Sequence, residues 1–307
     1  MSGPQNQLDG EILPPPVGPP PGPSSGPGAS RYALIAAAST VVVFALLAYV
    51  VVNAPGWERV KASFFDWDQF VESAPGIVAA FRINIALFLT AEVLILIFGL
   101  LLAVLRGLPG PVFFPVRLLA TIYVDVFRAL PGLLVIFVLG FAIPGLRLPG
   151  VPDEPFFWAV VALTLLYSAY VSEVYRAGIE SVHPSQAAAA RSLGLTQLQA
   201  LRFVVVPQAV RRVIPPLLND FIGLQKDTVL VSAIGIVEIF RQTQLRLQAT
   251  FNFTPFLVTA IVFLLVTIPL ARFTDWLVSR ERDRRYAAAI TAQGTRARRG
   301  RLLGFGR

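Results

Sequence analysis

Two adjacent residues of opposite charge, Lys226 and Asp227, interrupt an otherwise apolar stretch of this sequence. An ionisable side chain deep in a membrane-spanning segment costs at least ~2.5–3.5 kcal/mol, so it normally faces protein or water. A lysine ammonium can hold a carboxylate, and an aspartate can hold an ammonium, so the pair is suited to a small polar solute. A structural ion pair between helices is the alternative, and the sequence leaves both open. Asp220, near one end of the same stretch, is assigned a structural role.

Catalytic and metal chemistry find no support in the rest of the sequence. The chain has no cysteine and a single histidine, His183, which excludes thiolate sites, cysteine nucleophiles and a histidine cluster. No Gly-x-x-x-x-Gly-Lys-Ser/Thr loop is present to hold the phosphates of ATP. The net charge of +8 comes without a basic stripe interleaved with aromatics, so nucleic-acid binding is not expected. We therefore predict a protein that is not an enzyme and binds no metal or cofactor itself.

The elements that must position these residues are predicted to be membrane helices. The chain is 55% hydrophobic and only 14% charged, with a mean hydropathy of +0.67, whereas soluble domains carry roughly 25% charged residues. About 20 apolar residues suffice for a helix to cross the ~30 Å hydrocarbon core. Long continuous runs indicate an all-α membrane protein of about six transmembrane helices. The predicted spans are 32–52, 85–105, 121–143, 157–174, 213–240 and 253–276.

The basic residues predict the orientation of these helices. Arginines gather in the loop 106–117, in the long loop 176–212 and in the C-terminal tail, while acidic residues are frequent in 66–72 and 153–154. Positive charge favours cytoplasmic loops, so we predict a multi-pass protein of the cytoplasmic membrane with both termini in the cytoplasm. Six basic residues go against this rule, namely Arg59, Lys61, Arg82, Arg147, Arg241 and Arg246.

The loop 176–212 carries the most specific pattern. The run Ala187–Ala190 favours a helix, and Gly194 can end it in a left-handed conformation. Thr196 and Gln199 have the spacing of a capping box for a second helix. Apolar residues then line one side of that helix (Leu195, Leu198, Leu201 and Val205), and Pro207 is expected to end it. Two short angled helices outside the bilayer can dock in a partner's groove or rest on the membrane surface.

This loop resembles the cytoplasmic loop of membrane subunits of ABC importers. That loop reads Glu-Ala-Ala, three residues, Gly, nine residues, Ile, one residue, Leu-Pro. Here Ala188-Ala189-Ala190, Gly194, Val204 and Val206-Pro207 fall in the same register without a gap. Ala188 replaces the family's usual glutamate, which removes the carboxylate that would contact the ATPase there. The resemblance implies that Ala188, Ala189, Ala190, Gly194, Leu195, Leu198 and Pro207 form the ATPase-coupling loop.

Three further stretches are similar to permeases of the polar amino-acid (histidine, glutamine and glutamate) type. They are YVDVFRALPGLLVIF at 123–137, SAYVSEVYRAGIESV at 168–182 and LQKDTVLVSAIGIVEI at 224–239. The resemblance implies a five-helix permease domain at 76–285, with an extra transmembrane helix and external loop at 31–75. The Pro/Gly-rich segment 1–30 is expected to be a disordered cytoplasmic tail, and 286–307 a basic one.

The same resemblance implies residues of a substrate path. Lys226, Asp227 and Thr228 belong to its Lys-Asp-Thr segment, and Glu173 and Arg128 acquire a role in the pathway or its gating. Glu173 and Arg176 can alternatively form an ordinary contact between successive helical turns. Arg128 can alternatively extend its charge to the membrane interface.

The implied function is import of a polar, glutamate- or glutamine-like amino acid, with ATP and Mg²⁺ bound by a separate ABC ATPase subunit. The other expected partners are a second permease chain (the same or a sister protein), an extracytoplasmic amino-acid-binding protein and membrane lipid. The alternatives are a secondary transporter driven by an ion gradient, although no internal inverted repeat is visible, and a membrane scaffold that does not transport.

Overall fold

The computed structural model describes residues 27–303, with side chains described for residues 31–280. Within this part the regular structure is entirely helical, as the long apolar runs predict. The predicted tails 1–30 and 286–307 fall largely outside the residues whose side chains are described. The chain divides into two units, Met1–Val60 and Lys61–Arg307, which are described separately.

The first unit contributes one apolar helix, α1 (Pro27–Val52). Its residues 31–52 are all exposed within the structure, and its apolar side chains surround the whole helix rather than one face. Such a helix needs an apolar solvent on every side, which fits the predicted extra transmembrane segment. The short helix α2 (Trp57–Phe64) follows it.

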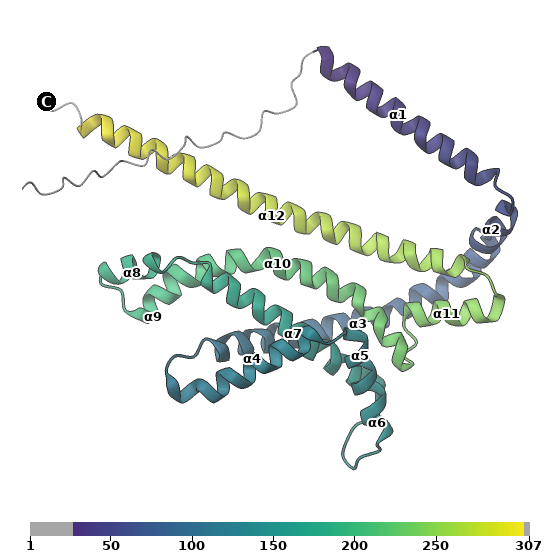
Figure 1. The fold of residues 1–307 in the computed structure, drawn as a ribbon, viewed down its shortest axis with the longest axis horizontal. Helices are drawn as coiled ribbons and strands as arrows, with labels where there is room; N and C mark the ends of the chain where they lie inside the picture. The colour runs from purple at the N-terminus through teal and green to yellow at the C-terminus, as the bar shows by residue number, and fades with distance from the viewer. Residues whose placement is uncertain (1–26, 304–307) are drawn as a thin grey trace, which may run out of the picture. The chain divides into compact units, whose positions relative to one another are not determined.

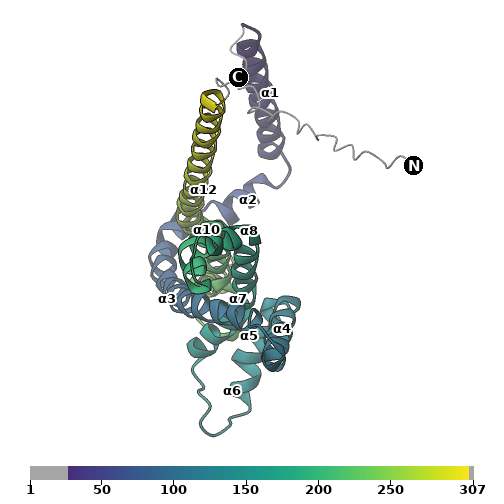
Figure 2. The same cartoon turned by 90° about the vertical axis from the view of Figure 1, so that its left-hand side faces the viewer.

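The second unit is organised around α7 (Pro155–Glu180). This helix packs most extensively on α3 (Trp67–Arg106) and next on α10 (Val206–Asp227), while α12 (Thr254–Leu303) covers α3 and α10. Figure 1 shows α3, α7 and α10 running together, and Figure 2, seen from the end that carries α8 and α9, shows α7 between its neighbours. The shared core is built from fully buried side chains, including Leu87, Ile95, Leu163 and Leu224.

Glycines allow α7 to approach its neighbours closely. A Cβ added at Gly99 of α3 would come within 2.7 Å of Val171 Cγ1 on α7. A Cβ added at Gly178 of α7 would overlap Val213 Cγ2 on α10 and would lie 3.5 Å from the carbonyl oxygen of Ala209. Both contacts require the absence of a side chain, so these glycines set the distance between the central helices.

Replacing Gly178 by alanine is expected to destabilise the fold by about 1–3 kcal/mol, the usual cost of overpacking. The β-branched Val213 has little rotamer freedom to make room. Gly145→Ala is the matched control, because a Cβ at Gly145 meets nothing within 4 Å. Thermal unfolding in detergent should show a lower Tm for G178A only; equal Tm values would contradict the close packing.

The third predicted span is not one straight helix. A 3-10 turn, η1 (Pro111–Phe113), leads into α4 (Phe114–Ala129), and α5 (Gly132–Phe137) follows after a bend of 105°. Leu130 has an extended backbone, with ψ 137, as the residue before Pro131 prefers. A π-helical turn, η2 (Val138–Ala142), and α6 (Ile143–Gly145) complete the segment.

The described residues contain four helices that are long and apolar enough to span a membrane, or five if the bent pair counts as one span. The four lie at 31–52, 57–106, 155–180 and 254–280. The predicted span 213–240 is not among them. It consists of the end of α10, a 3-10 segment η4 (Thr228–Ile234) and the start of α11 (Ile239–Thr250). Prolines and charged residues within it lower its hydropathy and interrupt regular helix.

Candidate functional site

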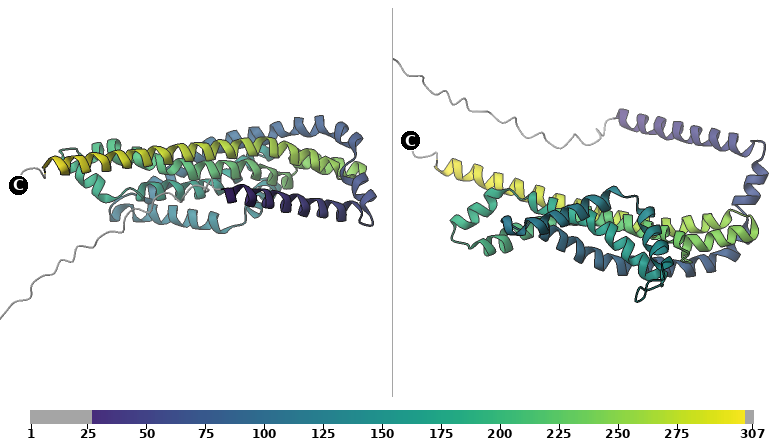
Figure 3. Two further views of the ribbon diagram at one scale, coloured as in Figure 1. Left: turned by 90° about the horizontal axis from the view of Figure 1, so that it is seen from above. Right: turned by 60° about the horizontal axis from the view of Figure 1, so that its bottom comes forward.

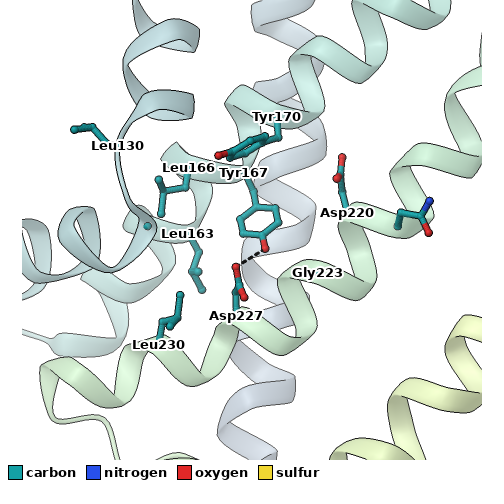
Figure 4. Close-up of a pocket in the computed structure, with 11 residues that line it drawn as sticks. Leu130, Leu163, Leu166, Tyr167, Tyr170, Asp220, Gly223, Asp227 and Leu230 are labelled. Atoms are coloured by element: carbon teal, nitrogen blue, oxygen red, sulfur yellow. Dashed lines mark hydrogen bonds between the residues drawn. The ribbon is translucent and has the colours of Figure 1, made fainter.

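A cavity of about 260 Å³ opens between α7, α10 and the bend between α4 and α5. Figure 4 shows Tyr167 of α7 pointing to Asp227 of α10, with Tyr170 of α7 and Asp220 of α10 also in the wall of the cavity. Leucines supply much of the remaining wall (Leu130, Leu163, Leu166 and Leu230), together with Gly132, Asn219 and Gly223. An apolar cavity with a few converging polar groups is the usual form of a small-molecule site.

Asp227 is held in place by a tyrosine from the neighbouring helix. The hydroxyl of Tyr167 donates to Asp227 Oδ2 at 2.8 Å, a charge-assisted hydrogen bond. Gly223 makes room for this contact, since a Cβ there would lie 3.4 Å from the Tyr167 hydroxyl. The second carboxylate oxygen of Asp227 remains available to a ligand, so the structure places the predicted residue Asp227 in the wall of the cavity.

Asp220 also lines the cavity, where the sequence had suggested a structural role. Its Oδ2 is shielded from solvent and has no hydrogen-bond partner among the described residues. Such an atom is costly to leave unpaired. The cavity thus presents two carboxylates, and no lysine or arginine lines it, an arrangement that suits an ammonium group.

Lys226 does not form an ion pair with Asp227 within the described part of the chain. Its side chain is exposed, because consecutive residues of a helix point in different directions. Thr228 is fully buried. Its hydroxyl accepts from Asn84 Nδ2 at 3.0 Å, and the same Asn84 nitrogen donates to Glu238 Oε2 at 2.9 Å. Thr228 therefore belongs to a polar network that joins α3 to the start of α11.

Glu173 and Arg128 come together with two further arginines. Glu173 Oε1 lies 2.6 Å from Arg106 Nη1 at the end of α3, and 3.6 Å from Arg128 Nη1 at the end of α4. Glu173 Oε2 lies 2.7 Å from Arg176 Nη2, and Arg176 also contacts Glu180 at 2.5 Å. The sequence identified Arg106 only as a basic residue of a loop. Its contact with Glu173 could not be foreseen, because the two residues are far apart in the chain.

The predicted helix-turn-helix is present as α8 (Pro184–Ser192) and α9 (Gln197–Ala200). Gly194 has a left-handed backbone, with φ 91, and Thr196 forms the complete capping box with Gln199. These local predictions are confirmed. Figure 3 shows α8 and α9 projecting at one end of the unit.

Apolar side chains are exposed on this projection. Leu198 is 73% exposed, Leu193 82% and Phe203 63%, whereas Leu195 is half-buried. Ala190 is buried against the hairpin and Ala188 and Ala189 are exposed. Exposed apolar side chains outside a membrane favour a docking surface. The sequence did not single out Leu193 and Phe203, because they lie outside the apolar stripe expected for the second helix of the hairpin.

The prediction that Pro207 ends the second helix is wrong. The chain passes from α9 through a π-helical turn, η3 (Leu201–Val205), directly into α10, with Pro207 in its first turn. The π-helical turn just before Pro207 interrupts the regular hydrogen-bond pattern of the helix, which accommodates a residue without an N–H. The hairpin is therefore continuous with the helix that carries Asp220 and Asp227.

Comparisons with known proteins agree with this architecture. The family model described as "Binding-protein-dependent transport system inner membrane component" matches residues 95–283, more than half of the chain. The probable amino-acid permease protein YxeN of Bacillus subtilis is 32% identical over 66% of this chain and 90% of its own length. The probable glutamine ABC transporter permease protein GlnM of the same organism is 38% identical over 60% of this chain and 83% of its own. The glutamate/aspartate import permease protein GltK of Escherichia coli is 36% identical over 58% and 80%.

Two solved structures share the fold. The crystal structure of an amino acid ABC transporter with histidines has a TM-score of 0.64 and 30% identity, covering 70% of this chain and 98% of that one. The inward-facing MetNI methionine ABC transporter has a TM-score of 0.54 at 18% identity and supports the fold alone.

Proposed function

The chain belongs to the binding-protein-dependent transport system inner membrane components, and on this premise we propose that it carries a polar amino acid through the cavity between α7 and α10. It is the permease subunit of an ABC importer, a multi-pass protein of the inner membrane. It is not itself an enzyme, and the family binds no cofactor. An ATPase subunit and a binding protein are its implied partners.

The substrate class is supported by the relatives and by the cavity. The relatives are described as permeases for amino acids, glutamine, or glutamate and aspartate, and one solved structure holds histidines. Asp220 and Asp227 both line the cavity, and Asp220 Oδ2 has no hydrogen-bond partner among the described residues. In this proposal the two carboxylates receive the ammonium that every free amino acid carries. The unpaired Asp220 Oδ2, on a residue that lines the cavity, is the observation on which the assignment depends most.

The loop that couples transport to ATP hydrolysis is assigned to α8 and α9. Gly194 sets the angle between the helices, and Leu198 offers the most prominent apolar contact of α9. The exposed Ala188 and Ala189 lie where the ATPase would approach α8, and the buried Ala190 packs the hairpin. Since α9 continues through Pro207 into α10, a displacement of the hairpin is transmitted along the helix that lines the cavity.

A second permease chain, identical or a sister protein, is assigned to the open side of the cavity. Asn219 and Lys226 of α10 are both exposed there in the single chain. A lysine within a membrane-embedded helix requires protein or water around it. A second chain over this face would enclose the pathway and leave Lys226 lining it, where its ammonium can meet the substrate carboxylate. Thr228 is assigned a supporting role, in which its buried hydrogen bond with Asn84 holds the end of α10 in place.

Both termini are assigned to the cytoplasm, counting the irregular segment 213–240 as a sixth crossing beside the five spans. The hairpin with Arg191 and Arg202 must face the ATPase, and the same side carries the loop between α3 and α4 with Arg106 and Arg117. Basic loops favour the cytoplasm.

Reconstitution tests the function as a whole. Proteoliposomes that contain the permease and its ATPase should accumulate a labelled polar amino acid only under two conditions. ATP must be present on the side of the membrane that the ATPase faces, and the binding protein must be present on the opposite side. Uptake that survives ATP depletion and collapses with an ionophore would instead identify a secondary transporter.

Replacing Tyr167 by phenylalanine is expected to reduce the initial uptake rate about tenfold, because Asp227 loses a hydrogen bond worth about 1.5 kcal/mol. Tyr123→Phe is the control. The Tyr123 hydroxyl bonds the Leu165 carbonyl at 2.9 Å and lies outside the cavity lining. Equal uptake by Y167F and Y123F would mean that the contact with Asp227 does not serve transport.

A further inference from the structure

The ion-pair cluster around Glu173 lies directly beside the candidate substrate cavity. Tyr170, which lines the cavity, precedes Glu173 by one turn of α7, and Leu130, which also lines it, follows Arg128 by two residues. The Tyr170 hydroxyl donates to the Arg128 carbonyl oxygen at 3.4 Å. Because α7 runs on from Glu173 towards α8, the cluster occupies the side of the cavity that leads to the coupling hairpin.

The three arginines hold Glu173 unequally. Arg106 and Arg176 make short contacts, at 2.6 and 2.7 Å, and the Arg106 side chain is only 13% exposed. Arg128 lies at 3.6 Å, beyond hydrogen-bond distance, and is 44% exposed. A partly exposed pair at this distance is weak. Of the three ion pairs of Glu173, the one with Arg128 of α4 is therefore the one that breaks most easily.

The charges of the cluster also favour release of Arg128. Arg106, Arg128 and Arg176 supply three positive charges, against two negative charges from Glu173 and Glu180. When Arg128 leaves, Glu173 keeps both short contacts, so no buried carboxylate is left unpaired. Departure of Arg106 would instead strand a charge in a poorly hydrated site, which is costly.

The hairpin is linked to this cluster through the end of α7. Arg212 of α10 donates through Nη1 to the carbonyl oxygen of Ser181, directly after α7 ends. Gly178 packs against Val213 one turn earlier. Pro184 then begins α8. A force on α8 therefore moves the end of α7 and the start of α10 together, and moves Glu173 relative to α4.

From this geometry we propose that Arg128 and Glu173 form a releasable latch at the cytoplasmic mouth of the cavity. The latch joins the end of α4 to α7 beside the cavity, and displacement of the α8–α9 hairpin opens it while Arg106 and Arg176 stay bound to Glu173. The proposal rests on the transport function assigned above, and it names the contact that separates the cavity from the cytosol.

Because the chain has no cysteine, label found on the permease subunit reports only an introduced thiol. Leu230→Cys places one thiol in the wall of the cavity. The labelling rate of this thiol by a membrane-impermeant maleimide is measured in inside-out vesicles that contain the assembled transporter without nucleotide. Adding Arg128→Gln should raise the rate about two- to fivefold, the range for a partly exposed charged pair. Arg128→Lys keeps the charge without the guanidinium fork and should give an intermediate rate.

Arg117→Gln is the matched control on the same helix. Its guanidinium donates to the carbonyl oxygens of Leu108 and Gly110, at 2.7 and 2.6 Å, and contacts no carboxylate within the described residues. Labelling of R128Q and R128K at the rate of R117Q would overturn the latch. ATP-driven uptake by the parent chain, which keeps Leu230, distinguishes the two proposals. If the importer takes up substrate but R128Q does not change the labelling rate, the latch alone is rejected. If R128Q speeds labelling but no amino acid is taken up, the transport assignment alone is rejected.

Discussion

Replacing Asp227 by asparagine is expected to reduce amino-acid uptake at least about 30-fold. The change removes the negative charge that faces the cavity, and loss of one partner from a buried charged contact costs about 2–5 kcal/mol. Asparagine keeps the size of the side chain and can still accept the hydrogen bond from Tyr167, so the fold should be preserved. The measurement is the initial rate of uptake of a labelled amino acid into proteoliposomes with ATP and the binding protein.

Asp125→Asn is the control for this prediction. Asp125 is an exposed residue of α4 that does not line the cavity, so its substitution should leave the uptake rate unchanged. If D227N and D125N take up substrate at similar rates, Asp227 has no direct part in transport, and the hydrogen bond from Tyr167 is structural.

Introducing a charge at the tip of the hairpin, Leu198→Glu, is expected to weaken binding of the ATPase at least about 30-fold and to abolish uptake. Leu198 is 73% exposed, and central apolar residues of an interface are worth about 2 kcal/mol or more. Gly194→Pro should act similarly, since proline cannot adopt the φ of 91 found there. Co-purification of the ATPase with the tagged permease measures the effect.

Leu146→Glu provides a matched control, because Leu146 is also highly exposed, at 66%, and follows α6 rather than α8. It should retain the ATPase. Retention of the ATPase by L198E at the level of L146E would show that the hairpin is not the docking surface.

The parts of the fold that could be predicted from the sequence are those set by local physics. The long apolar runs around 85–105, 157–174 and 253–276 became helices because lipid leaves few other ways to satisfy a backbone. The turn at Gly194 and the cap at Thr196 depend on residues that are neighbours in the chain. Such features need no knowledge of tertiary contacts.

Interactions between distant segments could not be predicted in this way. Lys226 and Asp227 looked like one functional pair in the sequence, but helix geometry turns them apart, and Tyr167 rather than Lys226 contacts Asp227. Asp220 became a cavity residue only through the packing of α10 against α7. Arg106 joins Glu173 across 67 positions of sequence, a distance over which spacing gives no signal.

The stretch 213–240 was predicted to be a regular membrane-spanning helix, and the structure does not show one there. A span was predicted there from its length, but Pro215 and Pro216, the charged residues and the 3-10 segment after Asp227 indicate an irregular helix that lines a pathway. Irregular backbone at membrane depth is tolerated where it borders a cavity. The departure from a regular span is therefore consistent with the position of the candidate site.

The most direct test of transport through this cavity is protection of the Leu230→Cys thiol by substrate in the assembled, purified transporter. A polar amino acid that the reconstituted importer accumulates should slow maleimide labelling of this cysteine, and the protection should disappear when Asp227→Asn is added. Unchanged labelling at concentrations of that amino acid that saturate uptake would place the transport path elsewhere and contradict the assignment.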